Sequence, residues 1–208
     1  MDLQAFFKMS YGLYVLSAAF DGKQNGCIVN TVTQVTAEPP KATVAVSKQN
    51  LTTELIEQSG FFNAVPLTEK ATMDLIGRFG FRSGREEDKF SGLEHGVDAH
   101  GVWYPTQNAA AMFSFKVIGK LDLDTHVLFV GKAVEAVKLS DDPVMTYDYY
   151  HRVKKGETPP NAPSYKKPEQ KTGWRCKICG YVYEGEQLPA DFICPLCKHG
   201  AEDFEKLG

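Results

Sequence analysis

The 208-residue sequence has no run of about 18 or more apolar residues, so it contains no predicted transmembrane helix. It has no long run of one charge, and its formal net charge is only −3, which argues against a nucleic-acid partner. Residues 1–7 lack the basic and apolar regions of a signal peptide. We therefore expect a cytoplasmic protein without membrane insertion.

Two nucleotide-binding patterns are also missing. The sequence has neither the G-x-G-x-x-G pattern of a Rossmann fold nor the G-x-x-x-x-G-K-S/T pattern of a P-loop. Cysteine is scarce, with five in the chain, and four of the five stand in two closely spaced pairs. This usage is typical of reduced thiols in a cytoplasm and not of a disulfide framework.

The two cysteine pairs predict a metal site. They are Cys-x-x-Cys turns separated by 14 residues. One such turn lets two thiolates bind an ion, and a second completes a tetrahedron that suits zinc or iron. A redox dithiol is the non-metal alternative, but it needs only one pair. The predicted ligands are Cys176, Cys179, Cys194 and Cys197.

The surroundings of the cysteines favour iron over zinc. Five aromatic residues crowd this segment and would exclude water from the sulfur atoms: Trp174, Tyr181, Tyr183, Phe192 and Phe204. The stretch Cys-Lys-Ile-Cys-Gly-Tyr-Val-Tyr-Glu-Gly, followed by Ile-Cys-Pro-Leu-Cys, resembles rubredoxin, in the shortened form found at the end of rubrerythrins. Lys198 stands where the second turn of that family usually has glycine. The resemblance implies one Fe(Cys)4 centre, and a structural zinc ribbon remains the alternative.

The first 150 residues predict a mainly β fold. Many short alternating segments with turn residues between them indicate a β-barrel. The expected strands are 12–20, 25–36, 42–47, 60–65, 112–119 and 125–138. The expected helices are 3–9, 52–59 with Thr52 or Thr53 as N-cap, 68–79, and one that begins at Pro143. Residues 80–92 are expected to form a loop.

Three stretches of this part, 25–40, 46–53 and 125–131, resemble the flavin reductase family with an FMN-binding split β-barrel. A flavin ring needs short polar groups along its edge, and its phosphate needs hydroxyls, amides and a cation near a helix N-terminus. Each candidate has an ordinary alternative as strand surface or solvated loop. The candidates are Asn30, Thr31, Val32 and Thr33 for the ring, and Ser47, Lys48, Asn50, Thr53, Arg82, Ser83, Arg85 and Lys89 for the phosphate.

Two further residues have competing interpretations. The resemblance places His126 near the flavin face where nicotinamide stacks, whereas a lone strand histidine is more often a packed core residue. The acidic neighbour expected from the family has shifted or been lost, because Asp124 precedes His126 by two residues. Cys27 has no evident partner base and is expected to be a small buried apolar residue.

Residues 151–171 predict a connector. They hold six lysines or arginines, two glutamates and four prolines, a composition typical of an extended, semi-rigid linker. The alternatives are a solvated spacer and a basic strip for a partner. The predicted domains are therefore 1–150, the linker 151–171, and a rubredoxin-like domain at 172–208.

Together the two halves resemble the high-molecular-weight rubredoxins. This resemblance implies a homodimeric electron-transfer flavoprotein. NADH or NADPH would reduce FMN, which would pass single electrons to iron. A flavodiiron protein would then reduce nitric oxide or oxygen, in nitric oxide detoxification or the response to oxidative stress. Two alternatives stay open: a reductase that releases reduced flavin and carries a zinc ribbon, and a non-enzymatic flavin-binding module.

Overall fold

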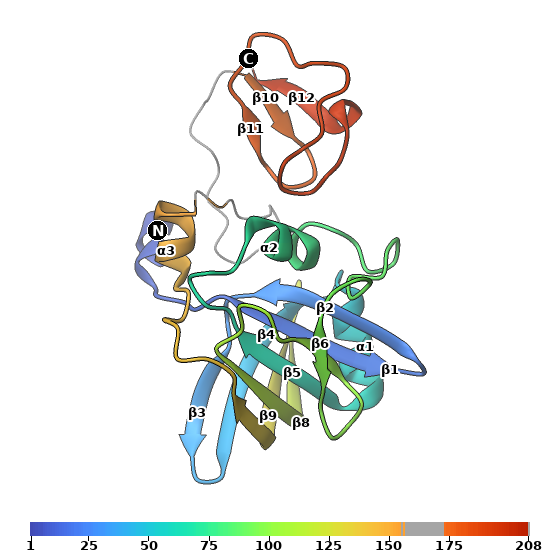
Figure 1. Ribbon diagram of the computed structural model, residues 1–208. Coiled ribbons are helices and arrows are strands. Elements are labelled where there is room, and N and C mark those ends of the chain that lie inside the picture. The colour runs from blue at the N-terminus through green and yellow to red at the C-terminus, as the bar shows by residue number, and fades with distance from the viewer. Residues whose placement is uncertain (155, 157–172, 208) are drawn as a thin grey trace.

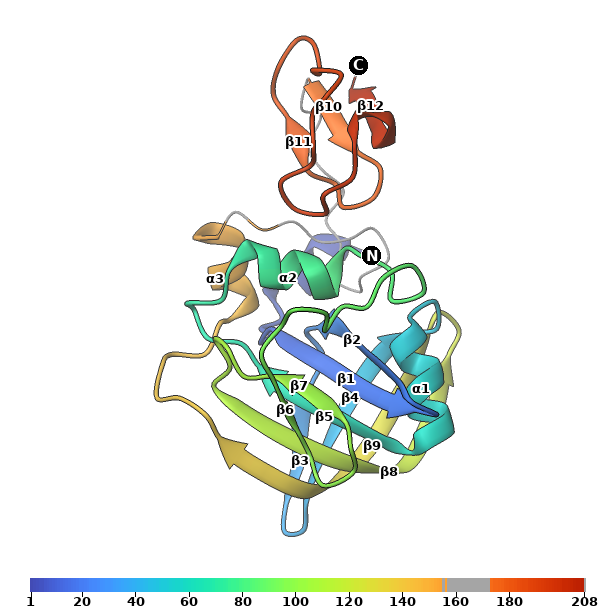
Figure 2. The same cartoon turned by 45° about the vertical axis from the view of Figure 1, so that its right-hand side comes forward.

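The structure is a computed structural model that describes residues 1–154, 156 and 173–207. A larger β domain, blue to orange in Figure 1, is followed by a small red domain that lies over helix α2 in both views (Figures 1 and 2). Most of the predicted linker, 151–171, lies outside the described residues. Among the described helices, none has the length and apolar character needed to cross a membrane.

The larger domain is built on one curled antiparallel sheet, which confirms the mainly β prediction. Its seven strands lie in the order β2-β1-β5-β8-β9-β4-β3. The sheet curls far enough that β2 also contacts β4 across the fold. The strands are β1 (Tyr14–Phe20), β2 (Lys23–Val29), β3 (Thr33–Ala37), β4 (Pro40–Ser47), β5 (Phe61–Pro66), β8 (Ala111–Leu123) and β9 (His126–Lys138).

The single strand expected over 25–36 was wrong. The chain leaves the sheet after Val29 and re-enters at Thr33, so β2 and β3 lie at opposite ends of the strand order. Thr31 holds the break in place, because its hydroxyl donates to the carbonyl of Ala45 (2.9 Å) and accepts from the Ala45 amide (3.1 Å). The alternating β-branched pattern continues through the break, which explains why the sequence showed one strand.

Helix α1 (Leu51–Ser59) follows β4, and its N-cap is Asn50 and not a threonine. The two threonines predicted as N-caps make other hydrogen bonds. The hydroxyl of Thr53 donates to the carbonyl of Ser47 (2.6 Å), and the hydroxyl of Thr52 accepts from the side chain of Asn25 (2.9 Å). Both threonines are buried, which ties the start of α1 to β2 and β4.

Two other helices begin later than expected. Helix α2 (Met73–Gly80) starts after Thr72, whose hydroxyl accepts from the amide of Leu75. Helix α3 (Tyr147–Arg152) starts after Thr146 and not at Pro143. One contact accounts for both late starts. Thr68 and Val144 form an isolated β-bridge, which keeps the segments before α2 and α3 extended.

Of the loop expected over 80–92, Gly80 is the last residue of α2, and residues 81–92 contain no regular helix or strand. A short hairpin, β6 (His95–Val97) with β7 (Trp103–Pro105), was not predicted from the sequence. The chain also begins with a 3-10 helix, η1 (Leu3–Lys8). Two buried apolar clusters stabilise the domain, one inside the curled sheet around Phe62 and Phe129, the other beneath α2 around Phe79 and Phe90.

The small domain is a three-stranded sheet in the order β11-β10-β12 with long connecting loops. Its core consists of the four paired cysteines and aromatic rings, with Phe192 packed against Phe204 (centroids 5.3 Å apart) and Tyr183 (4.9 Å). Its elements are β10 (Gly173–Cys176), β11 (Val182–Tyr183), the 3-10 helix η2 (Ala201–Asp203) and β12 (Phe204–Leu207).

Candidate functional site

The four paired cysteines converge on one point. All four are buried, and their sulfur atoms lie within 4.8 Å of one another. The Cys176–Cys197 and Cys179–Cys194 sulfur pairs are each 3.5 Å apart. A tetrahedral ion with metal–sulfur bonds of about 2.3 Å needs sulfur–sulfur edges of about 3.8 Å. The arrangement therefore fits a four-coordinate thiolate metal.

The thiols also have strongly perturbed pKa values because they share one small space. Hydrogen bonding, mainly with Cys179, lowers the pKa of Cys176 to about 6. Hydrogen bonding with Cys176 is the main cause that raises the pKa of Cys179 and lowers that of Cys194. Crowded thiols resist simultaneous ionisation, and a bound cation removes that conflict.

Each cysteine pair ends in a matched backbone turn. The Gly180 amide donates to the carbonyl of Cys176 (2.9 Å), and the Lys198 amide donates to the carbonyl of Cys194 (3.0 Å). Both residues have positive φ, 83° at Gly180 and 63° at Lys198. A left-handed conformation costs a non-glycine residue about 1–2 kcal/mol. The second turn is thus strained where the first is not.

We expect the Lys198→Gly substitution to raise the unfolding free energy of the metal-loaded small domain by about 0.5–1 kcal/mol, after the extra backbone entropy of glycine is subtracted. Chemical unfolding followed by metal–thiolate absorbance measures this. The control is Lys177→Gly in the first pair, where φ is not positive, and where we expect a loss of stability. A destabilised Lys198→Gly protein would contradict the strain argument.

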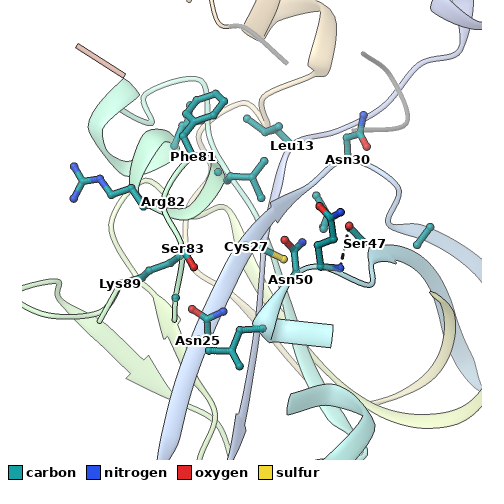
Figure 3. A pocket seen from close by; sticks show the side chains of 18 of the residues that line it. Leu13, Asn25, Cys27, Asn30, Ser47, Asn50, Phe81, Arg82, Ser83 and Lys89 are labelled. Atoms are coloured by element: carbon teal, nitrogen blue, oxygen red, sulfur yellow. Dashed lines mark hydrogen bonds between the residues drawn. The ribbon is translucent and has the colours of Figure 1, made fainter. Parts of the chain in front are cut away.

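A cavity of about 340 Å³ lies in the β domain between the start of α1, the end of α2 and the 80–92 loop. Figure 3 shows Cys27 and Asn50 lying close together at its centre, with Ser83 and Asn25 on one side and Ser47 on the other. Seven predicted residues line it: Asn30, Ser47, Asn50, Arg82, Ser83, Lys89 and His126. Residues from four separate parts of the sequence thus meet in one pocket.

Lys89 is the buried cation of this pocket, with 4% of its surface exposed. Its Nζ donates to the carbonyls of Gly26 (2.9 Å) and Phe79 (3.3 Å), which fixes the ammonium group on the pocket wall. Burial lowers the pKa of Lys89, because the charged form is poorly solvated there. An ammonium group has three donors, so one remains for an anion.

Asn25 presents a polar atom that the described structure leaves unsatisfied. Its amide nitrogen donates to Thr52 (2.9 Å), but its buried carbonyl oxygen has no partner among the described protein atoms. Gly84 lies against that oxygen, and a Cβ at position 84 would lie only 2.0 Å from it. A buried oxygen that lacks a donor fits a hydroxyl-bearing ligand such as the ribityl chain of a flavin.

The remaining predicted flavin residues have other neighbours. Thr31 holds the β2–β3 break and Thr53 the start of α1, as described above, whereas Val32 and Thr33 line a separate hollow near Tyr11. Lys48 pairs with Asp122 (2.6 Å) on the surface, and Arg85 pairs with Glu54. Their roles as ligands stay predictions.

His126 is half-buried at the start of β9 and lines the cavity. Its Nδ1 lies 2.9 Å from the hydroxyl of Thr125, and burial lowers its pKa. The pocket also contains residues that the sequence did not single out, among them Asn25, Phe81 and Ile178. Phe81 follows a helix and Ile178 lies in a metal turn, and neither apolar residue carries a local signal that it faces a distant pocket.

Comparisons with known proteins identify both halves. Residues 6–156 match the family described as flavin reductase like domain, and residues 174–205 match the rubrerythrin, rubredoxin-like domain. A high molecular weight rubredoxin of Moorella thermoacetica is 36% identical over 229 aligned residues, which cover 100% of both chains. The chain belongs to the high-molecular-weight rubredoxin family. It is therefore an oxidoreductase with a flavin reductase domain and a four-cysteine metal site.

Other relatives resemble one half each. A ferric-chelate reductase (NAD(P)H) of Archaeoglobus fulgidus is 44% identical over 79% of this chain and 98% of its own. A rubrerythrin of Nitratidesulfovibrio vulgaris is 52% identical over 40 residues, or 19% of this chain and 20% of its own. An FMN-binding protein of Thermus thermophilus, 25% identical, superposes with a TM-score of 0.61 over 67% of this chain and 82% of its own.

Proposed function

We propose that this chain is an electron-transfer oxidoreductase that joins NAD(P)H oxidation to a one-electron iron centre. NAD(P)H would deliver a hydride to FMN held in the cavity, and the reduced flavin would pass electrons singly to an Fe(Cys)4 site. The observation that carries the proposal is Ile178. It lies between two of the paired cysteines, and it lines the same cavity as the predicted flavin residues.

The electron balance explains why two centres are joined. A hydride carries two electrons, whereas a tetrathiolate iron cycles between ferric and ferrous and accepts one. The flavin accepts the pair, releases its proton to solvent and gives up the electrons in two separate steps. Two successive iron reductions, each followed by delivery to an acceptor, then complete one turnover.

The pocket residues supply the binding chemistry for FMN. In this proposal, Lys89 and Ser47 would hold the phosphate beside the N-terminus of α1, where backbone amides point outward. Asn25 would accept from the ribityl chain. His126, which pairs with Ser47 across β4 and β9, would lie in the neighbourhood of the nicotinamide. Its lowered pKa keeps the imidazole neutral at pH 7, which suits a site that receives a hydride.

The first test concerns the metal. We expect protein purified from its native host to contain about one iron per chain and to be red, because a ferric tetrathiolate absorbs visible light alongside the flavin. Elemental analysis and an absorption spectrum measure this. Stoichiometric zinc in the native protein, with the yellow colour of flavin alone, would support the reductase that releases reduced flavin instead. Zinc in recombinant protein alone decides nothing, since such sites accept either metal.

The proposed acceptor is a flavodiiron protein that reduces nitric oxide or oxygen. The support is the family resemblance together with the one-electron chemistry of an iron–thiolate centre. We expect the purified chain to sustain NAD(P)H-dependent nitric oxide reduction when such a protein is added. If the rate of NAD(P)H oxidation does not change when the partner is added to protein with intact iron and flavin, a flavodiiron protein is not the acceptor.

We also propose a homodimer. Exposed apolar residues are concentrated on two neighbouring strands, and a cluster of exposed apolar residues commonly marks an interaction surface. They are Ile118, Leu121 and Leu123 on β8, and Val134 and Val137 on β9; Val35 is also exposed, on β3 at the edge of the sheet.

The double substitution Ile118→Glu and Leu121→Glu is expected to convert a dimer to a monomer, because it would bury four charges at the interface. Light scattering measures the mass. The control is Val97→Glu, an exposed valine on β6 outside this surface. A wild-type monomer that binds flavin tightly would refute the dimer.

A further inference from the structure

The two domains meet at one closely packed point. Gly77, in the middle of α2, lies under the backbone of Leu196, which stands between the cysteines of the second pair. A Cβ built on Gly77 would lie 2.2 Å from the Leu196 carbonyl oxygen and 3.3 Å from its carbonyl carbon. The obstacle is backbone and not a flexible side chain, so the two segments could not stay in place if position 77 carried a Cβ.

Glycine at this position is costly for the helix itself. In a helix interior it is about 0.8–1 kcal/mol less favourable than alanine. No local demand explains it, because Gly77 does not have the positive φ that favours glycine elsewhere in the chain. The close approach of Leu196 is the feature of the described structure that accounts for it.

Two side chains extend the contact to the cavity. Phe81, which follows α2, is buried in the same cluster as Leu196 and the four cysteines, and it also lines the cavity. Ile178, between the cysteines of the first pair, lines the cavity from the other domain. Both cysteine turns therefore face the β domain, the second through Leu196 and the first through Ile178.

We infer that the surface formed by Gly77 and Phe81 is a docking site for the metal-binding turns of the same chain. In the docked state, one electron passes from the reduced flavin to ferric iron across Phe81 and Ile178, and no bond is formed or broken. This inference rests on the proposed function, because it assigns the route by which the proposed transfer takes place.

The test replaces Gly77 with alanine and with leucine. Both are good helix formers, so the β domain should be as stable as wild type or more so. The small domain should be displaced, more by leucine than by alanine. We expect anaerobic stopped-flow reduction by NADH to show flavin bleaching at the wild-type rate, followed by iron reduction slowed at least about tenfold in Gly77→Leu, since small misplacements of reacting centres cost rate steeply.

Small-angle X-ray scattering of the metal-loaded protein gives a second readout that is independent of activity, and the radius of gyration should rise in Gly77→Leu. The matched control is Gly119→Ala in β8, where a Cβ would meet only Val130 at 4.0 Å; neither readout should change there. Wild-type transfer in Gly77→Leu, or equal slowing in Gly119→Ala, would overturn the docking site. An absence of flavin-to-iron transfer in the wild type would instead overturn the proposed function.

Discussion

The Cys194→Ser protein is expected to lose its metal almost completely and, with it, all delivery of electrons to a partner. A serine hydroxyl is not ionised near neutral pH, and the other three thiolates cannot complete a tetrahedron. NAD(P)H oxidation with an artificial flavin oxidant should remain largely intact, because the predicted flavin residues lie in the other domain. Metal analysis, flavin content and the two activities measure these outcomes separately.

The matched control is Cys27→Ser. Cys27 is the one cysteine outside the cluster, so the Cys27→Ser protein should bind as much metal per chain as the wild type. If NAD(P)H oxidation collapses in Cys194→Ser while flavin content is unchanged, electrons do not reach the flavin before the metal, and the proposed order is wrong.

Replacing Lys89 with methionine is expected to weaken FMN binding roughly 10- to 100-fold, since a buried hydrogen bond to a charged group contributes about 1.5–3 kcal/mol. The matched control is Lys48→Met. Both lysines are predicted phosphate ligands, but Lys48 is exposed and paired with Asp122. We expect its loss to change the affinity by no more than about threefold. Equilibrium titration of the flavin-free protein measures both constants, and equal losses would contradict the assignment to Lys89.

The same lysine gives FMN affinity a specific pH dependence. The protonated amine binds phosphate, so its contribution is present below the Lys89 pKa and is lost as pH rises through it. Burial lowers that pKa, so the loss begins at a lower pH than for an ordinary lysine, whose pKa is about 10.4. The Lys89→Met protein should lack this alkaline dependence. Titrations across the alkaline range that superpose for both proteins would show that Lys89 does not face the phosphate.

The metal site could be predicted from sequence because its information is local. Two Cys-x-x-Cys turns specify both the ligands and their geometry within a few residues. The flavin pocket is different. Ser47 and Asn50 were predictable from their place before a helix, whereas Asn25 and Phe81 reach the cavity only because distant strands and helices meet there. Thr31 and Lys48 have the expected polarity, but Thr31 hydrogen-bonds to the backbone of Ala45, and Lys48 pairs with Asp122.

Secondary structure shows the same division. The strands that become β1, β4, β5 and β9 are mostly apolar segments, and they were predicted nearly in full. The break at 30–32 was missed because Thr31 and Val32 have high strand propensity, and tertiary hydrogen bonding to β4 overrides it. The starts of α2 and α3 depend on a bridge between residues 76 positions apart, Thr68 and Val144, and a local window contains no trace of such a pairing.

The break between β2 and β3 also has a consequence for folding. Three residues join β2 to β3, although these strands lie at opposite edges of the sheet. So short a connection is possible only because the sheet curls and brings its two edges together. Asn30, in that break, lines the cavity. The pocket thus depends on long-range closure of the sheet and not on any local unit of the chain. Bound flavin would therefore stabilise only the fully closed sheet, so that the melting temperature should rise with flavin concentration.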